Sequence, residues 1–261
     1  MHSAHLKTGR RQMIRQAAIL CGGRGTRLGA ITADTPKPLL PMGEIPFLDV
    51  LVFELARHGI RKILLLAGFQ AHKIIEYATS TPLKARFGLE IVVSVEPQPA
   101  GTGGALRHAW DQLEDRFFLL NGDTWFHINS LALAGPMAED ASTAGIIAFA
   151  PYRGRGTVRR GSAFWSTCRG FRRAPRPAGV RADQRGVYAL RRDPLLDSFK
   201  PDCSLERDVF PRLAQAGRLL GVSYEGYFVD IGVHGDLARA RREVPERRRR
   251  PAALSRPRRS P

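Results

Sequence analysis

The sequence predicts an α/β protein with a doubly wound, mostly parallel sheet. Apolar runs of strand length alternate with segments of helical spacing through the first 150 residues, which indicates repeated βαβ units. The first unit is a strand at 17–21, a helix at 46–56 and a strand at 62–67. Residues 63–67 are apolar throughout, as expected of a strand that is covered on both faces. Ligands of such sheets bind beyond the carboxyl ends of the strands.

The same alternation continues to residue 150 and returns after residue 186. The remaining expected elements are, in order, a helix near 71–78, a strand at 90–95, a loop at 96–104, a helix at about 105–113, strands at 117–120, 144–150 and 186–190, a helix that opens at 204–210, and strands at 219–222 and 228–232. Residues 1–16 are a polar leader, and residues 17–241 are expected to form one domain.

The positive charge is concentrated in two segments. The formal net charge is +17, from 41 Lys and Arg against 24 Asp and Glu. Residues 152–186 hold ten arginines against one acid, and residues 239–261 hold ten against two, so the rest of the chain is neutral. Residues 242–261 are rich in Arg and Pro and poor in apolar side chains, which predicts a disordered basic tail. A nucleic-acid-binding protein is the weaker alternative, because few aromatic residues for stacking accompany the arginines.

The rest of the composition indicates a globular protein of the cytoplasm. The hydrophobic content of 43% is enough for a sizeable core. No run approaches the roughly 18 apolar residues of a membrane span, and residues 1–16 contain no apolar signal-peptide core. Cys21, Cys168 and Cys203 are far apart and form no CxxC pair, so neither a zinc site nor a disulfide framework is indicated.

The loop after the first strand is the candidate active site. Its sequence is Gly22-Gly23-Arg24-Gly25-Thr26-Arg27-Leu28, and it closes with Pro36-Lys37-Pro38. Glycines let backbone N–H groups approach an anion closely, and Arg27 and Lys37 add positive charge. These features predict a loop that wraps phosphates. The glycines alone would also suit an ordinary turn, but the spacing of Arg27 and Lys37 argues against that interpretation.

Four further motifs contain candidate site residues. They are Gly101-Thr102-Gly103-Gly104-Ala105, Asn121-Gly122-Asp123, Ser204-Leu205-Glu206 and Phe228-Val229-Asp230-Ile231-Gly232. The first two follow predicted strands, where a ligand is expected. The acids also have structural interpretations: Asp123 as a turn former or helix cap, Glu206 as a capping partner of Ser204, and Asp230 as an acid that only ends a strand.

Together these motifs resemble those of sugar-1-phosphate nucleotidyltransferases, and within them the D-glycero-D-manno-heptose 1-phosphate guanylyltransferases. The resemblance covers about residues 17–150 and 186–240. It implies a Rossmann-like nucleotidyltransferase fold whose small mixed β part binds the sugar. It also implies an enzyme of nucleotide-sugar biosynthesis that uses GTP and Mg²⁺ and serves lipopolysaccharide or another cell-surface polysaccharide.

The resemblance assigns roles to individual residues. The nucleotide-binding set is Gly22, Gly23, Gly25, Thr26 and Gly101; the catalytic set is Arg27, Lys37 and Asp123; the Mg²⁺ ligands are Asp123 and Asp230; and Glu206 touches the sugar. Within these sets, Arg27 would hold the triphosphate, Lys37 would lie at the α-phosphate, and Gly101 would lie beside the base.

Elementary chemistry requires the same kinds of residue. An oxygen of the sugar 1-phosphate must attack the α-phosphorus in line with the departing pyrophosphate, so two anions must be held together against their repulsion. Positioning and positive charge supply most of the catalysis in such transfers. Mg²⁺ prefers one or two carboxylates together with phosphate oxygens and water, which suits Asp123 and Asp230.

The chain departs from the family between residues 156 and 186. A Glu-Lys-Pro-like turn and an Asn-Gly step are missing there, and with them a sugar-binding acid, a phosphate-binding lysine and a sugar-contacting asparagine. A one-base shift of the reading frame can restore family-like sequence in this segment. The same shift gives residues 255–261 the nucleophile motif of haloacid-dehalogenase-type phosphatases. We infer that residues 160–185 and 255–261 are read out of frame, and that the tail is the remnant of a fused heptose phosphatase.

Two enzymatic alternatives stay open. The same fold could act on another sugar or base, as a mannose-1-phosphate guanylyltransferase or a sugar-phosphate uridylyltransferase. The chain could also be a catalytically impaired homologue, because the 160–185 segment lacks the usual contacts. The expected partners are a nucleoside triphosphate and a sugar 1-phosphate, without nucleic acid or membrane. A homo-oligomer and a partner heptose phosphatase are both compatible with the sequence.

Overall fold

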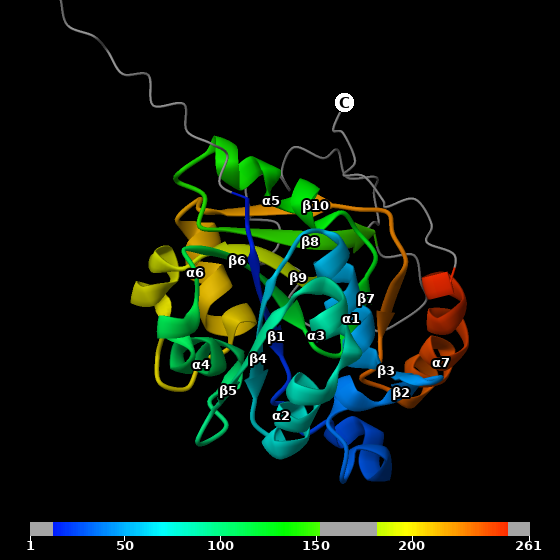
Figure 1. Cartoon of the computed structure of the whole chain (residues 1–261). Coiled ribbons are helices and arrows are strands. Elements are labelled where there is room, and N and C mark those ends of the chain that lie inside the picture. The colour runs from blue at the N-terminus through cyan, green and yellow to red at the C-terminus, as the bar shows by residue number, and fades with distance from the viewer. Residues whose placement is uncertain (1–12, 152–181, 250–261) are drawn as a thin grey trace, which may run out of the picture.

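The computed structural model describes residues 13–151 and 182–249. The first twelve residues of the leader, residues 160–181 of the segment inferred to be out of frame, and residues 250–261 lie outside the described residues. The described chain is built around a seven-stranded sheet with the strand order β10-β8-β9-β6-β1-β4-β5 (Figure 1).

The sheet is mostly parallel. Its strands are β1 (Gln16–Leu20), β4 (Lys62–Ala67), β5 (Glu90–Val95), β6 (Arg116–Asn121), β8 (Gly145–Pro151), β9 (Ala182–Arg191) and β10 (Leu219–Ser223). Only β9 runs antiparallel to its neighbours in this sheet, which are β6 and β8. Two small antiparallel sheets pair β2 (Pro41–Met42) with β3 (Ile45–Pro46) and β7 (Thr124–Phe126) with β11 (Phe228–Asp230). The predicted mostly parallel sheet is therefore confirmed, and β11 pairs outside it in a small antiparallel sheet.

Helices cover both faces of the sheet. They are α1 (Phe47–Arg57), α2 (Ala71–Ser80), α3 (Pro82–Phe87), α4 (Gly101–His108), α5 (Ser130–Glu139), α6 (Phe210–Gln215) and α7 (His234–Arg249), with short helical turns at Thr26–Thr32, Lys37–Leu39, Trp110–Gln112, Asp193–Ser198 and Leu205–Val209. Helices α1, α2, α5 and α7 bury apolar residues on one face of the sheet, whereas α4 and α6 do so on the other. This is the doubly wound arrangement. None of the helices in the two described ranges has the length and apolar content needed to span a bilayer.

The start of α4 corrects one sequence-based boundary. A loop was expected up to residue 104 and a helix from about 105, but α4 begins at Gly101. The carbonyl of Cys203 accepts hydrogen bonds from the N–H groups of Gly103 and Gly104, at 2.9 and 3.3 Å. A Cβ atom on Gly103 would lie only 2.4 Å from Cys203 Sγ. The glycines therefore allow the first turn of α4 to pack directly on a backbone segment about 100 residues away.

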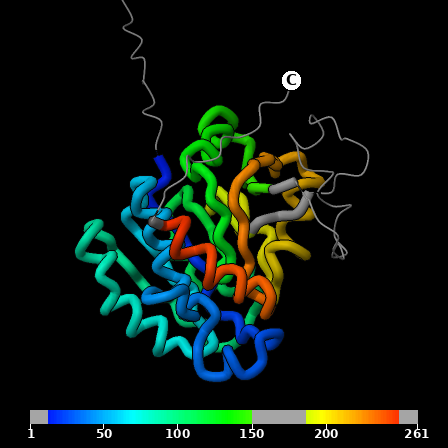
Figure 2. Tube along the Cα trace, turned by 90° about the vertical axis from the view of Figure 1, so that its right-hand side faces the viewer, coloured from blue at the N-terminus to red at the C-terminus, as the bar shows by residue number. Residues whose placement is uncertain are grey.

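The prediction of disorder from residue 242 is wrong for residues 242–249, which belong to α7. Leu237, Ala240 and Val244 are buried at helical spacing, and they join the apolar cluster under α1 and β11. Arg247 of α7 also lies against an aromatic ring, with its guanidinium carbon 3.9 Å from the centroid of Tyr227. The helix, red in Figure 2, lies on the same face of the sheet as α1. Few apolar residues suffice here because they share one face.

A substitution at Val244 tests this packing. Val244→Ala should lower the free energy of unfolding by about 2 kcal/mol, because it removes two buried methyl groups and leaves a cavity. Urea denaturation followed by circular dichroism measures this change. The control is Arg241→Ala on the exposed side of the same helix, for which we expect less than about 0.5 kcal/mol. Equal effects of the two variants would contradict the packing of α7.

Candidate active site

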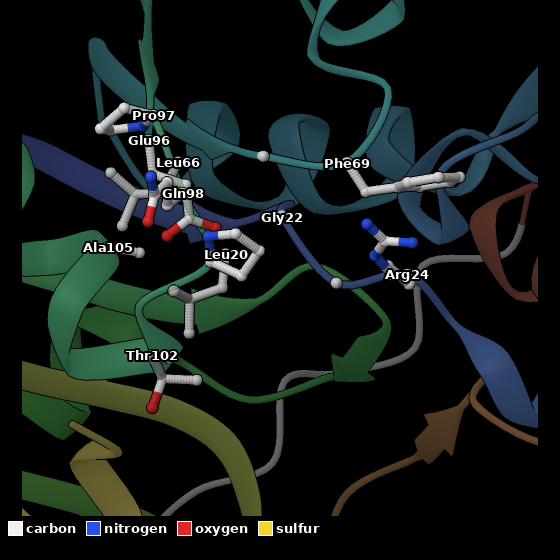
Figure 3. Close-up of a pocket in the computed structure, with 14 residues that line it drawn as sticks. Leu20, Gly22, Arg24, Leu66, Phe69, Glu96, Pro97, Gln98, Thr102 and Ala105 are labelled. Atoms are coloured by element: carbon white, nitrogen blue, oxygen red, sulfur yellow. The ribbon is translucent and has the colours of Figure 1, made fainter. Parts of the chain in front are cut away.

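The carboxyl ends of three neighbouring strands and the first turn of α4 surround a cavity of about 400 Å³ (Figure 3). It is lined by Leu20, Gly22, Gly23 and Arg24 at the end of β1, by Leu66, Gly68 and Phe69 at the end of β4, by Glu96, Pro97, Gln98 and Pro99 after β5, and by Gly101, Thr102 and Ala105 of α4. Strands β1, β4 and β5 are parallel neighbours, so their carboxyl ends share one edge of the sheet. The volume is within the range of small-molecule sites.

Two glycines of the first loop, Gly22 and Gly25, have close neighbours that leave little room for a side chain. A Cβ atom on Gly22 would lie 2.9 Å from Glu96 Oε1 and 3.3 Å from the backbone nitrogen of Gly68. Gly25 has a left-handed backbone, with φ +67°, and a Cβ atom there would lie 2.9 Å from Lys37 Cγ. The loop therefore keeps its backbone open toward the cavity while the stem of Lys37 packs on Gly25. Thr26 begins the helical turn that follows.

Lys37 and Asp123 form an ion pair across 86 residues of sequence. Both are mostly buried, with side-chain exposures of 13% for Lys37 and 21% for Asp123. The chain reaches this arrangement because the N–H of Gly122 donates to the carbonyl of Leu20 at 3.0 Å, and a Cβ atom on Gly122 would lie 2.4 Å from that oxygen. The glycine thus lets the end of β6 lie directly against the end of β1.

Asp230 and Arg27 join this pair. Strand β11 pairs with β7 so that Asp230 lies opposite Thr124, the residue after Asp123. Burial raises the pKa of Asp230, and the charge of Asp123 raises this pKa further, whereas Lys37 and Arg27 lower it. The Arg27 guanidinium is also near Asp230 in space, since a Cβ atom on Gly232 would lie 3.3 Å from Arg27 Nη2 and 2.8 Å from Asp230 Oδ1.

Arg27, Lys37, Asp123 and Asp230 are called the charged cluster below, and its two acids have the chemistry of a magnesium site. Two carboxylates that repel each other in a partly buried position are stabilised as anions by a divalent cation. The described residues contain no group of three or more His, Cys, Asp or Glu side chains placed to hold a metal. A metal bound by two acids needs its other ligands from phosphates and water, which is the preference of Mg²⁺ rather than of zinc. The residues present therefore fit Mg²⁺.

Two predicted residues lie at α4. Gly101 lines the cavity, with φ +76°, and a Cβ atom there would lie 2.6 Å from the Cys203 carbonyl oxygen. Glu206 is not among the cavity-lining residues. Its Oε2 accepts hydrogen bonds from the hydroxyls of Thr102 and Ser204, both at 2.8 Å. The bond from Ser204 favours the structural interpretation of Glu206 as a partner of Ser204, and the bond from Thr102 also links the Leu205–Val209 turn to α4. Contact of Glu206 with a sugar stays a prediction.

Sequence reasoning did not single out several residues of the cavity. Phe69, Glu96 and Gln98 follow β4 and β5, and Arg24 lies between the glycines of the first loop. Burial raises the pKa of Glu96, which the N–H of Ala100 partly offsets by donating to Oε2 at 3.3 Å. The rule that ligands bind at carboxyl ends of strands applies to β4 and β5 as well as to β1 and β6, and it would have found the first three.

Two guanylyltransferases are similar to the chain in sequence. The D-glycero-alpha-D-manno-heptose 1-phosphate guanylyltransferase of Campylobacter jejuni is 40% identical over 114 residues, which are 44% of this chain and 50% of that protein. The match therefore spans half the length of this relative. The protein of the same name from Aneurinibacillus thermoaerophilus is 28% identical over 235 residues, which cover 88% of this chain and 98% of that protein.

The fold is also that of a solved structure. HddC from Yersinia pseudotuberculosis superposes with a TM-score of 0.71 and 23% sequence identity, over 88% of this chain and all of that chain. The family model described as "Nucleotidyl transferase" matches residues 16–247, from the first residue of β1 into α7. The chain therefore belongs to the nucleotidyl transferase family.

Proposed function

We propose that the chain transfers GMP from GTP to a sugar 1-phosphate, D-glycero-D-manno-heptose 1-phosphate, and releases pyrophosphate. The observation that carries this proposal is the position of the charged cluster at the same sheet edge as the 400 Å³ cavity, joined to it by one glycine loop. A nucleoside can occupy the cavity while its phosphates reach the cluster. The names of the two bacterial relatives support the choice of nucleotide and sugar.

The residues of the cluster suit a displacement at phosphorus. An oxygen of the sugar phosphate forms a bond to the α-phosphorus, and the bond from that phosphorus to the bridging oxygen breaks, so pyrophosphate leaves with the bonding electrons. Arg27 and Lys37 reduce the repulsion between the two phosphates and stabilise the charge on the leaving group. The backbone of Gly22, Gly23 and Gly25 positions the triphosphate, and this orientation supplies much of the remaining rate.

Asp123 and Asp230 are the residues that we propose to hold Mg²⁺, which would neutralise phosphate charge when bound. Lys37 is paired with Asp123, so each balances the charge of the other. Phosphate oxygens are the alternative partner for Lys37. Binding of the nucleotide then exchanges one ion pair for another rather than burying new unpaired charges, whose cost would be high.

The position of Glu96 favours guanine over uracil as the base of the nucleotide. Its carboxylate lines the cavity, and its Oε1 approaches the loop glycines Gly22 and Gly68 closely. Guanine presents an N–H and an amino group side by side, and a carboxylate can accept from both. Uracil offers one N–H between two carbonyl oxygens, and a carboxylate repels those oxygens. Pyrophosphate release measured over a panel of triphosphates and sugar phosphates separates the heptose guanylyltransferase from a mannose-1-phosphate enzyme, a uridylyltransferase and an impaired homologue.

Three further expectations accompany this proposal. A cytoplasmic location fits the need for nucleoside triphosphate, and the heptose nucleotide would serve lipopolysaccharide or another cell-surface polysaccharide. Assembly into a homo-oligomer is a separate proposal. The remnant of a fused phosphatase is proposed for the tail at 242–261, and its phosphatase-like residues 255–261 lie outside the described residues. Sequencing the gene tests that last proposal, since an uninterrupted frame that encodes this protein would refute it.

The first prediction concerns the metal ligand. Asp123→Asn should lower kcat at least about 100-fold, because the amide carries no charge for Mg²⁺ or Lys37. Pyrophosphate release measures the rate, and circular dichroism verifies that the fold is retained. Asp111→Asn, at an exposed position after α4, is the control and should keep the normal rate. A normal rate in Asp123→Asn would refute its role at the metal.

A second prediction concerns the base. Glu96→Gln should lower kcat/KM for GTP by roughly 10- to 100-fold, the value of a hydrogen bond to a charged group, and should change kcat/KM for UTP much less. Steady-state kinetics with both nucleotides measure this selectivity. The matched control is Glu90→Gln, an exposed acid at the start of β5, the strand that Glu96 follows. Parallel losses for GTP and UTP would show that Glu96 does not distinguish the bases.

The pH dependence provides a third prediction. The Glu96 carboxylate accepts from guanine only while ionised, and burial raises its pKa. As the pH falls, the preference for GTP over UTP should therefore begin to decline at a higher pH than that at which an ordinary glutamic acid becomes protonated. The ratio of the two kcat/KM values is measured against pH. In Glu96→Gln the ratio should not vary with pH over the same range. If this variant kept the pH dependence of the unmodified protein, the assignment would be contradicted.

A further inference from the structure

Arg24 is a cation on the cavity wall. It lies between Gly23 and Gly25 in the first loop and is exposed to solvent. Within the two described ranges, no carboxylate lies within ion-pair distance of its guanidinium, in contrast to Lys37 in the charged cluster. A positive charge that lines a cavity and has no protein counter-ion is available to an anionic ligand.

Phe69 holds this guanidinium at the cavity. The Arg24 guanidinium carbon lies 5.8 Å from the centroid of the Phe69 ring, and Figure 3 shows the two side chains facing each other. The N–H of Phe69 donates to the carbonyl of Gly22 at 3.2 Å, so the backbone at Phe69 is tied to the same loop that carries Arg24. An exposed cation–π contact is weak, at about 0.5–1 kcal/mol. Phe69 therefore orients the guanidinium but leaves its charge and its N–H donors free.

The charges on the cavity wall are separated. Glu96 and Arg24 are the charged side chains among the residues that line it, and Figure 3 shows them on opposite sides of Gly22. A ligand that spans the cavity meets a hydrogen-bond acceptor at one end and a cation at the other. A nucleotide has this polarity, with the donors of its base at one end and phosphates at the other.

We propose that Arg24, oriented by Phe69, contacts the terminal phosphate of the nucleotide, and thereby makes the site prefer a nucleoside triphosphate to a diphosphate. This inference rests on the proposed function. Arg27 and Lys37 lie beside Asp230 and Asp123, near the expected site of transfer at the α-phosphorus. Arg24 is the loop cation that remains for the far end of the chain of phosphates. Its planar guanidinium suits two oxygens of one phosphate.

A binding experiment without turnover tests this contact. The probes are GDP and a GTP analogue with a methylene group between the α- and β-phosphorus, titrated calorimetrically into the full chain with Mg²⁺ and without sugar phosphate. Arg24→Ala should weaken binding of the analogue about tenfold and binding of GDP less than about twofold, because only the analogue carries the third phosphate. Arg24→Lys should lie between, since an ammonium cannot make the paired contact.

Two further variants separate orientation from general disturbance. Phe69→Leu should weaken binding of the analogue a few-fold, because the guanidinium loses its platform, and Phe69→Tyr should retain normal binding. Arg107→Ala removes an exposed arginine of α4 outside the cavity lining, and should leave both affinities unchanged. Both alanine variants remove one positive charge, and we expect only Arg24→Ala to weaken binding of the analogue.

Three results would overturn the assignment in distinguishable ways. Equal weakening of GDP and the analogue in Arg24→Ala would place the residue at the inner phosphates or the nucleoside. Unchanged binding of both would remove Arg24 from the site while the proposed function stands. Failure of the unmodified chain to bind either nucleotide would refute the proposed function itself, and the contact with it.

Discussion

The repulsion between two neighbouring carboxylates is the constraint on which the site depends. Asp123 follows β6 and Asp230 ends β11, and pairing of β11 with β7 places them together in a partly buried position. Such an arrangement is costly unless cations neutralise it. Lys37 and Arg27 do so from the first loop. The strand pairing brings the two carboxylates together, and the cations of the loop stabilise them there.

The order of the strands places the cations of the first loop beside the two carboxylates. Strand β1 lies between β4 and β6, so the loop after β1 can contact the ends of both. On the β4 side it lines the cavity, and on the β6 side it reaches Asp123 through the contact of Gly122 with Leu20. A single loop therefore serves the nucleoside and the reacting phosphates. The central position of β1 explains why the glycines and cations of the site are concentrated in this segment.

The sequence predicted the elements whose signals are local. The apolar runs of β4 and β5 and the helix α1 follow from spacing alone, and the members of the charged cluster are residues to which the resemblance assigned roles. Other features depend on distant partners. The start of α4 depends on the Cys203 carbonyl, and α7 depends on three buried residues scattered among arginines. The roles of Phe69 and Glu96 depend on which strands are neighbours, which periodicity does not reveal.

One consequence of the close contacts around Glu96 concerns evolution. Cβ atoms on Gly22 and Gly68 would lie 2.9 and 2.5 Å from Glu96 Oε1, so two glycines from different loops leave just enough room for this carboxylate. The three positions form one steric unit, although they are far apart in the sequence. A bulkier residue at either glycine would displace the acid before it touched any ligand. Lineages that change the base preference should therefore change these three positions in concert, and engineered variants should be searched as triples rather than one site at a time.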